Sequence, residues 1–282
     1  MNKIIQMERI FKVMQYIENN LESEMNVSLL SDIACYSEYH FHRLFRAYCG
    51  ESIYSYKKRL LLEQSVKHLK YSDDSITEIA FKCGYDNQAS FNKAFKKAFS
   101  CSPSQARNQL VCINRDEIII NQNGIVSMKP DIIEIEAIHT ISVRAVGGYA
   151  QAAAEAWGKL MQFAYSKKQM HKNVKRIGVS HDDPDLTETN RIRYDACIDV
   201  EMSEELEMGL HRRVIAGGKY AKFLHTGSYD NLQNTYSYIF NDWLPDSGYK
   251  LIDNPPFEHY LNKDPRRTKP ENLKTEIYIP IV

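Results

Sequence analysis

Several features that mark other classes of protein are absent from this sequence of 282 residues. No apolar run approaches the ~20 residues that a helix needs to span a bilayer, and the first residues lack the apolar stretch of a signal peptide. There is no Cys-x-x-Cys pair and no zinc-type His/Cys spacing. We therefore expect a cytoplasmic protein with reduced thiols, no membrane partner, no metal and no cofactor. The six cysteines stand far apart, at positions 35, 49, 83, 101, 112 and 197.

An excess of either charge is also missing, since 36 Lys and Arg balance 36 Asp and Glu. Residues 1–112 carry 15 basic against 12 acidic side chains, an excess of three positive charges that the rest of the chain offsets. So small an excess fits phosphate contact but does not identify a nucleic-acid-binding protein by itself. The length allows two domains, each with its own core.

What the sequence does contain is one pattern written twice, over residues 30–50 and 79–103. Each copy places turn residues between two short amphipathic segments, as in a helix-turn-helix. The matched residues are Tyr36 with Tyr85, 49 positions apart, and Phe45 with Phe95, 50 positions apart. We therefore expect a one-residue insertion in the first turn of the second recognition helix.

Helical periodicity and capping residues extend from Glu8 to about Gln109. Ser52 is expected to begin a long helix, and Ser75 with Glu78 forms a capping-box sequence. The other expected signals are Ile10, Val13, Met14 and Ile17 on a first helix, Ser28, Ser37 and Asp86 as caps, Gly50 as a helix end and Gly84 in a turn.

Polar side chains are expected to face outward from both recognition helices, while phenylalanines face the core. They are Tyr39, His42, Arg43 and Arg46 in the first helix, and Gln88, Ser90, Asn92, Lys93 and Lys97 in the second. Arg43 suits guanine and Gln88 or Asn92 suits adenine, with ~1–3 kcal/mol of discrimination for a good pair. A solvated helical face would explain any one of them, but two such units on one chain favour DNA binding.

Together with Ser102-Pro103-Ser104-Gln105 and Arg107, this stretch resembles the tandem helix-turn-helix domain of the AraC/XylS transcription regulators. The resemblance covers about 100 residues and predicts a domain over 1–110. It implies base contacts by Tyr39, His42, Arg43, Gln88, Ala89, Ser90, Asn92 and Lys93. Cys35 stands where the first turn usually has glycine, and a positive φ there would cost on the order of 1 kcal/mol. Ala89 offers no hydrogen bond and suits only a thymine methyl.

After an expected linker over 111–127, strand-like runs alternate with helices in an order that occurs twice: strand, helix, strand, strand. Val143-x-x-x-Gly147 leads into the first helix as Phe223-x-x-x-Gly227 leads into the second. The closing strands match as well, which makes Asp195 and Glu276 equivalent. The expected strands are 132–149, 176–180, 193–200, 214–227, 257–261 and 276–282, and the expected helices are 150–165 and 231–244.

Glu276 stands on an otherwise apolar strand, so it is either exposed at an edge or buried for a ligand. A buried unpaired carboxylate is costly, and a cationic ligand would offset that cost. Aromatic side chains favour such a cation, although core packing explains each of them singly. The expected effector-binding residues are Glu276, Tyr149, Trp157, Phe223, Tyr236, Trp243 and Tyr260.

The duplicated pattern and the Thr275-Glu276-Ile277-Tyr278-Ile279-Pro280 ending resemble the GyrI-like effector-binding domain, here over 128–282 and placed as in Rob-type regulators. The resemblance implies an α+β domain of two β-α-β-β units around a central cleft that binds an amphipathic or cationic molecule. The whole chain is then a transcription regulator, with activation as the working assignment. Its expected partners are double-stranded DNA, an effector and, as a further candidate, RNA polymerase. Two alternatives stay open: a hydrolase using Glu276 with Tyr149, Tyr236 or Tyr260, and a protein-inhibitory module.

Overall fold

The computed structural model describes residues 3–108, 129–171, 173–184, 186–200, 206 and 209–282. The chain divides into two units, Met1–Ile118 and Ile119–Val282. The expected linker over 111–127 lies outside the described residues, so the domain limits 1–110 and 128–282 stay predictions. None of the helices in the described part is both long and apolar enough to cross a membrane.

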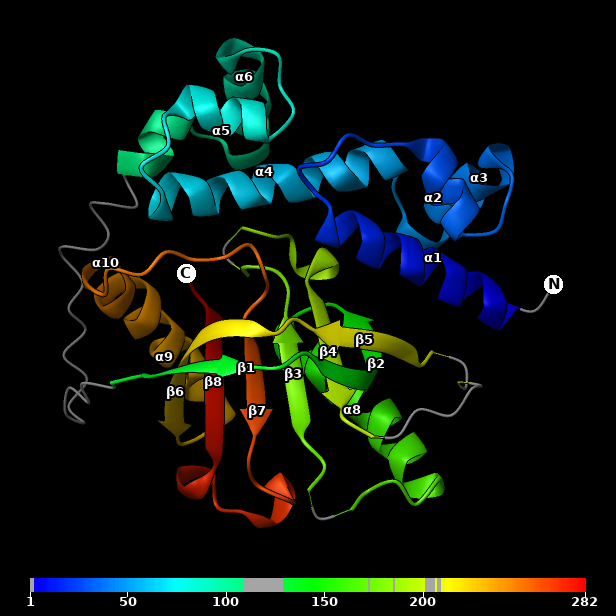
Figure 1. Cartoon of the computed structure of the whole chain (residues 1–282), viewed down its shortest axis with the longest axis vertical. Coiled ribbons are helices and arrows are strands. Elements are labelled where there is room, and N and C mark those ends of the chain that lie inside the picture. The colour runs from blue at the N-terminus through cyan, green and yellow to red at the C-terminus, as the bar shows by residue number, and fades with distance from the viewer. Residues whose placement is uncertain (1–2, 109–128, 172, 185, 201–205, 207–208) are drawn as a thin grey trace. The chain divides into compact units, whose positions relative to one another are not determined.

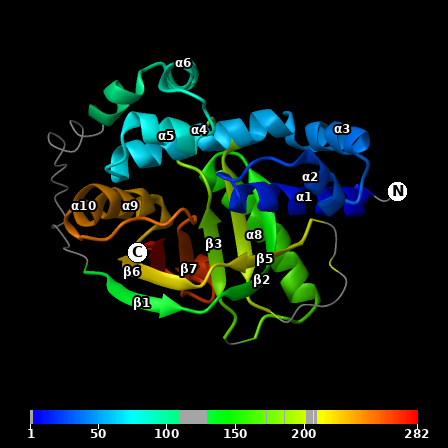
Figure 2. The ribbon, with the colours of Figure 1, turned by 45° about the horizontal axis from the view of Figure 1, so that its top comes forward.

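The first unit is all-α, as predicted, and its long central helix runs between two helix-turn-helix pairs (Figures 1 and 2). The helices are α1 (Lys3–Asn19), α2 (Val27–Ile33), α3 (Glu38–Cys49), α4 (Ile53–Tyr71), α5 (Ile76–Lys82) and α6 (Gln88–Phe99). The first pair packs on α1 and α4 through Ile10, Val13, Ile17, Leu30, Ala34, Phe41, Phe45, Ile53, Tyr56 and Leu60. The periodicity that predicted α1 is therefore confirmed.

Of the five predicted N-caps, two form as expected, two are displaced by one or two residues, and one holds its position without a side-chain bond. Ser52 and Ser75 accept bonds from Ser55 N and Glu78 N, and Glu78 completes the capping box. The predictions for Ser28 and Asp86 are wrong, because the caps of α2 and α6 are Asn26 and Asn87. Asparagine in an extended conformation satisfies a first-turn N–H with its side-chain oxygen, which starts each helix there. Ser37 occupies the N-cap position of α3 without a side-chain cap bond.

The one-residue difference between the copies lies in the turn and not in the recognition helix. The N-caps Ser37 and Asn87 are 50 positions apart while Tyr36 and Tyr85 are 49 apart, so the extra residue is Asp86. Both turns need left-handed backbone, with φ of 53° at Cys35 and 74° at Gly84. The suspected strain at Cys35 is therefore present.

The second unit is one eight-stranded antiparallel sheet with helices against it, which confirms the predicted α+β class (Figure 1). The strand order is β1-β6-β8-β7-β3-β4-β2-β5. The strands are β1 (Asp131–Ile135), β2 (Ile138–Val146), β3 (Arg176–Ser180), β4 (Arg193–Ile198), β5 (His211–Ile215), β6 (Gly218–Thr226), β7 (Phe257–Tyr260) and β8 (Lys274–Pro280). The helices are α8 (Tyr149–Ser166), α9 (Leu232–Tyr238), a π-helical segment η3 (Ile239–Trp243) and α10 (Leu244–Asp246). The expected strand over 132–149 is two strands, because the chain is interrupted at the exposed pair Glu136 and Ala137 and the two parts pair with different strands.

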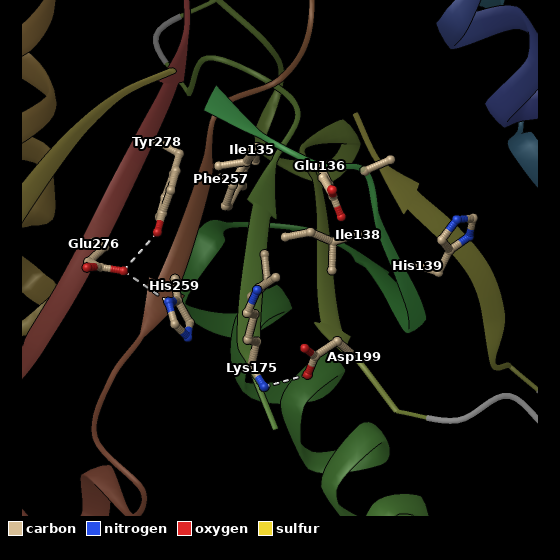
Figure 3. Close-up of a pocket in the computed structure, with 12 residues that line it drawn as sticks. Ile135, Glu136, Ile138, His139, Lys175, Asp199, Phe257, His259, Glu276 and Tyr278 are labelled. Atoms are coloured by element: carbon tan, nitrogen blue, oxygen red, sulfur yellow. Dashed lines mark hydrogen bonds and ion pairs between the residues drawn. The ribbon is translucent and has the colours of Figure 1, made fainter. Parts of the chain in front are cut away.

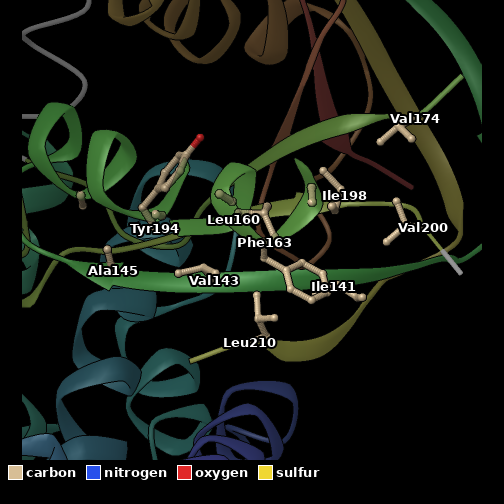
Figure 4. Packing of buried hydrophobic residues seen from close by; sticks show 14 residues of the cluster. Ile141, Val143, Ala145, Leu160, Phe163, Val174, Tyr194, Ile198, Val200 and Leu210 are labelled. Atoms are coloured by element: carbon tan, nitrogen blue, oxygen red, sulfur yellow. The ribbon is translucent and has the colours of Figure 1, made fainter. Parts of the chain in front are cut away.

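Both helical segments pack on the same face of the sheet, which we call the helix face. Helix α8 covers β2 and β4 through Val143, Ala196 and their neighbours (Figure 4). Helix α9 and η3 pack against Phe223 of β6 and Ile277 of β8. Residues that are paired across neighbouring strands point to the same face of a sheet. Glu258 and Gly178, which lie in the row of paired residues between Ile277 and Ala196, therefore also point to the helix face. The opposite face buries a second apolar cluster of Ile177, Val179, Cys197, Ile215, Tyr220 and Phe257.

The internal repeat read from the sequence is also visible in the strand pairing. Asp195 lies opposite Arg144 and Val179, and Glu276 lies opposite Leu224 and His259. These partners are themselves 80 positions apart, so Asp195 and Glu276 are equivalent, as expected. The two halves meet at β3 and β7, where Gly178 is paired with Glu258.

Candidate DNA-binding surface and ligand site

Helix α3 exposes three of its own four side chains that the sequence assigned to DNA. Tyr39 is 73% exposed, and Arg43 is exposed with its guanidinium 5.7 Å from the Tyr39 ring centroid. Arg46 is exposed as well, and His42 is half-buried and stacked on Tyr54 of α4 at 6.4 Å. Buried Phe41 and Phe45 fix the helix, so these side chains are presented from a rigid element.

Helix α6 presents an equivalent face, with Ala89, Ser90, Lys93 and Lys97 exposed. Gln88 is half-buried and its Oε1 accepts a bond from the Thr77 hydroxyl at 2.7 Å. Asn92 is half-buried, and its Oδ1 is shielded from solvent without a partner among the described residues. The second helix therefore offers fewer free acceptors than its sequence suggests.

The residues that carried the AraC/XylS resemblance hold the end of this unit together. Ser102 and Gln105 bond reciprocally as a capping box at 2.9 and 3.2 Å. Arg107 donates to the carbonyls of Leu69 and Asp74 at 3.2 and 2.6 Å. Their role in the structure is to tie the chain after α6 to the end of α4.

On the helix face of the second unit, a carboxylate is buried among tyrosines. Glu258 is 5% exposed, and Tyr236 of α9 donates to its Oε1 at 2.9 Å. Tyr260 donates to Oε2. Because Tyr260 has one proton to give, Tyr194 donates to Tyr260 (3.0 Å), and Trp157 Nε1 donates to Tyr194 (2.9 Å). Donors from helices α8 and α9 and from strands β4 and β7 thus lead to one carboxylate.

A glycine makes room for this cluster. A Cβ placed on Gly178 would lie 2.3 Å from the Tyr194 hydroxyl and 2.8 Å from the Tyr260 hydroxyl. Side chains of neighbouring strands meet over the gap that glycine leaves. The two hydroxyls therefore meet above Gly178, beside its paired residue Glu258.

The electrostatics of the cluster follow from its burial. Burial raises the pKa of Glu258, and the bonds from Tyr260 and Tyr236 offset this only in part. Burial likewise raises the pKa of Tyr194, Tyr236 and Tyr260, and the nearby carboxylate adds to the shift. No cationic side chain pairs with Glu258 among the described ion pairs.

Glu276 lies elsewhere, on the face of the sheet opposite the helices. It bonds with His259 at 3.1 Å and Tyr278 at 2.9 Å, and Lys222 Nζ is 3.6 Å away (Figure 3). Burial alone would raise the pKa of Glu276, but these three partners outweigh burial and lower it. Its side chain is 20% exposed and lines an open cavity.

Two sequence-family profiles match the chain. That of the GyrI-like small molecule binding domain matches residues 128–282, and that of a helix-turn-helix domain matches residues 30–109. The chain belongs to the GyrI-like family. With an AraC-type helix-turn-helix domain before it, the protein is a DNA-binding transcription regulator with a GyrI-like small-molecule-binding domain, as its sequence indicated.

Relatives share either the whole arrangement or one half of it. The transcriptional regulator Rob of Salmonella typhimurium is 20% identical over 94% of this chain and 95% of its own. A DNA gyrase inhibitor of Erwinia billingiae is 29% identical over 55% of this chain and 97% of its own. A solved EcmrR–DNA complex aligns with 91% of this chain and 99% of the EcmrR chain, at 18% identity and a TM-score of 0.48.

The GyrI-like domain brings together four of the seven expected effector residues. Trp157, Tyr236 and Tyr260 belong to the Glu258 cluster, and Tyr149 packs on Tyr194 at 6.4 Å while donating to the Asp182 carbonyl. The other three lie apart: Phe223 of β6 packs against Trp243 of η3 in the core, and Glu276 faces the opposite side of the sheet.

Sequence reasoning missed Glu258, Tyr194 and Gly178. In the four-residue strand β7, Phe257 and His259 share one face while Glu258 and Tyr260 share the other. Neither face is wholly apolar, so the sequence contained no sign that Glu258 is buried. The internal repeat was the signal that could have found these residues. Its offset of 80 positions aligns Glu258 with Gly178, and the two residues are paired in the sheet.

The equivalent of Glu276 in the first half of the domain is a structural ion cluster. Asp195 is fully buried and accepts bonds from Arg144 (2.7 Å), Arg213 (2.6 Å) and His181 (2.8 Å). Burial lowers the pKa of His181 to about 4, so this imidazole is neutral near pH 7. The two guanidinium groups already satisfy the carboxylate, which leaves it no role toward a cationic ligand.

Proposed function

We propose that this regulator reads DNA through α3 and α6, and that an amphipathic cation bound at Glu258 modulates its activity. RNA polymerase is the further partner we propose, since a transcription regulator acts through initiation. The observation that carries the ligand proposal is a carboxylate that is 5% exposed and whose partners among the described residues are tyrosine hydroxyls. A ligand regulates only if it favours one conformational state over another.

The proposed DNA contacts are those expected from the sequence, refined by the geometry of each side chain. The Tyr39 ring supports the Arg43 guanidinium, which is long enough for a bidentate bond to guanine. Gln88 holds its carbonyl against Thr77, so it presents its amide N–H groups and suits a base acceptor. It reads adenine bidentately only if the Thr77 bond opens.

Replacing Arg43 tests the DNA contact directly. Arg43→Ala is expected to weaken binding to a selected duplex of ~20 bp by ~1–3 kcal/mol, since one bidentate base contact is lost. Fluorescence anisotropy at fixed salt measures the affinity, because phosphate contacts make it salt-dependent. Lys67→Ala, which removes an exposed cation from α4, is the matched control. Equal affinity of the wild type for random and selected duplexes would contradict the proposal.

The buried carboxylate explains why the ligand carries positive charge. An ionised group out of water is unfavourable unless a charge or several hydrogen bonds compensate it. Glu258 accepts two bonds, whereas a carboxylate has about four acceptor positions. The rings of Tyr236, Tyr260 and Trp157 add apolar and cation–π contact. A lipophilic cation meets both requirements.

Thermal unfolding against amphipathic cations and their neutral analogues tests this site. A cation at 100 times its Kd adds about 2.7 kcal/mol to the unit that binds it. The stabilisation is expected in the wild type and lost in Glu258→Gln. Loss in Glu276→Gln alone would restore the assignment made from sequence. Product formation over many turnovers that stops in Glu258→Gln would instead favour the hydrolase alternative.

A further inference from the structure

The face of the sheet opposite α8 and α9 contains a cavity of about 570 Å³. The apolar part of its lining, which we call the floor, comes from Ile135, Ile138, Phe257 and Tyr278 (Figure 3). Ile177 lines the cavity as well. The Phe257 and Tyr278 rings stack at 4.4 Å, so this part of the floor is a flat aromatic surface. The volume lies within the range of about 300–1,000 Å³ that small-molecule sites occupy.

Carboxylates from three separate segments surround that floor. Glu136 lies between β1 and β2, Asp199 follows β4, and Glu276 is on β8 (Figure 3). Among the described residues that line the cavity, Lys175 is the one Lys or Arg, and its backbone N–H bonds Asp199 at 2.5 Å. Even with Lys222 counted against Glu276, the lining keeps a negative excess.

This cavity is distinct from the Glu258 cluster. His259 lines the cavity, whereas its neighbours Glu258 and Tyr260 point to the helix face. Successive residues of a strand face opposite sides of the sheet. One strand, β7, therefore contributes to two sites of different character: a single carboxylate closed in by tyrosines, and an open apolar floor with several carboxylates.

We infer that the cavity binds a linear polyamine. Such a molecule alternates methylene segments with ammonium groups, so its methylenes cover the isoleucines and the Tyr278 ring while its charges reach separate carboxylates. Lys222 already lies 3.6 Å from Glu276, so an ion with one charge would pair with Glu136 or Asp199 and not with both. The negative excess of the lining excludes an anionic ligand on the same electrostatic grounds.

Calorimetric titration of the full chain with spermidine tests the inference. Hexylamine, with one ammonium group, and 1,8-octanediol, with none, are the comparison ligands. Spermidine is expected to bind with one molecule per chain and more tightly than either. Glu136→Gln and Asp199→Asn are each expected to weaken spermidine binding about twofold to fivefold, the range of partly exposed ion pairs. Both replacements are isosteric and keep the side-chain acceptor oxygen, so the fold is retained; unfolding temperatures check this.

Glu271→Gln is the matched control, because it removes the same charge from an exposed site outside the cavity. An equal loss in this control would show that spermidine responds only to overall charge and would overturn the inference. Unchanged affinity in the Glu136→Gln, Asp199→Asn double variant would overturn it as well. Loss of spermidine binding in Glu258→Gln would assign the amine to the tyrosine-lined site. That site is tested separately with lipophilic cations, so either proposal can fail alone.

Discussion

Glu258 and Glu276 stand on neighbouring strands of one sheet and have opposite environments. Glu258 points to the helix face, is 5% exposed and, within the described part of the chain, accepts its hydrogen bonds from tyrosine hydroxyls. Glu276 points to the other face, is 20% exposed at its side chain and has Lys222 and His259 beside it. The pKa of the first is raised and that of the second is lowered. The exposure, the partners and the pKa of a glutamate in this sheet therefore depend on the face to which its side chain points.

The largest expected effect on this comparison comes from Gly178→Ala. The added Cβ would overlap the Tyr194 and Tyr260 hydroxyls, so the tyrosine cluster must shift. We expect ~1–3 kcal/mol of destabilisation, the usual result of overpacking, and loss of cation binding at Glu258 with spermidine binding unaffected. The loss of stability is measured by urea unfolding with tryptophan fluorescence as the signal, since both tryptophans, Trp157 and Trp243, lie in this unit.

Gly158→Ala is the control for that substitution. Gly158 lies inside α8, where an added Cβ meets nothing within 4 Å. Alanine is favoured over glycine in a helix interior by roughly 0.8–1.0 kcal/mol, so this variant is expected to be more stable. If Gly178→Ala is also neutral or stabilising, the hydroxyls do not meet over Gly178 as the structure has them.

Much of this arrangement follows from the sequence, and the part that does not has a physical reason. The predicted strand over 176–180 is β3, and Ser75 and Ser52 cap the helices they were expected to cap, because these signals are local. Glu276 was chosen for its apolar flanks. The central position of β3 and β7, and the face of the sheet that the helices cover, both depend on the strand order. A local sequence pattern does not contain the strand order.

The next effect compares a tyrosine hydroxyl on each face. Tyr236→Phe removes a donor from buried Glu258, and we expect a loss of about 1.5 kcal/mol, as for hydrogen bonds to charged groups. Tyr278→Phe removes a donor from Glu276, where His259 and solvent remain, so a smaller loss of roughly 0.5 kcal/mol is expected. The same urea titration checks both. Equal losses would mean that burial does not separate the two carboxylates.

The pH dependence of stability is expected to have opposite signs for the two glutamates. Folding raises the pKa of Glu258, so its contribution is full below the unfolded value near 4.5 and is lost as pH rises through the folded value. Folding lowers the pKa of Glu276, so its contribution is present above 4.5 and is lost as pH falls through the folded value. Urea unfolding of wild type, Glu258→Gln and Glu276→Gln across pH gives both differences, and two slopes of one sign would refute the contrast.

The smallest expected effect concerns Lys222, which lies beside Glu276 on the face opposite the helices. Lys222→Ala removes the ammonium 3.6 Å from Glu276, where both side chains are partly exposed, so the loss of stability is expected to stay below about 1 kcal/mol. The pKa of Glu276 should then rise, because a positive charge that favours its ionised form is gone.

Added salt should shrink the difference in stability between Lys222→Ala and wild type, since screening weakens such a pair. Salt should leave the effect of Tyr236→Phe unchanged, because Glu258 is 5% exposed and its described partners are uncharged hydroxyls. A salt-dependent Tyr236→Phe effect would place ions, and hence water, at the helix-face carboxylate.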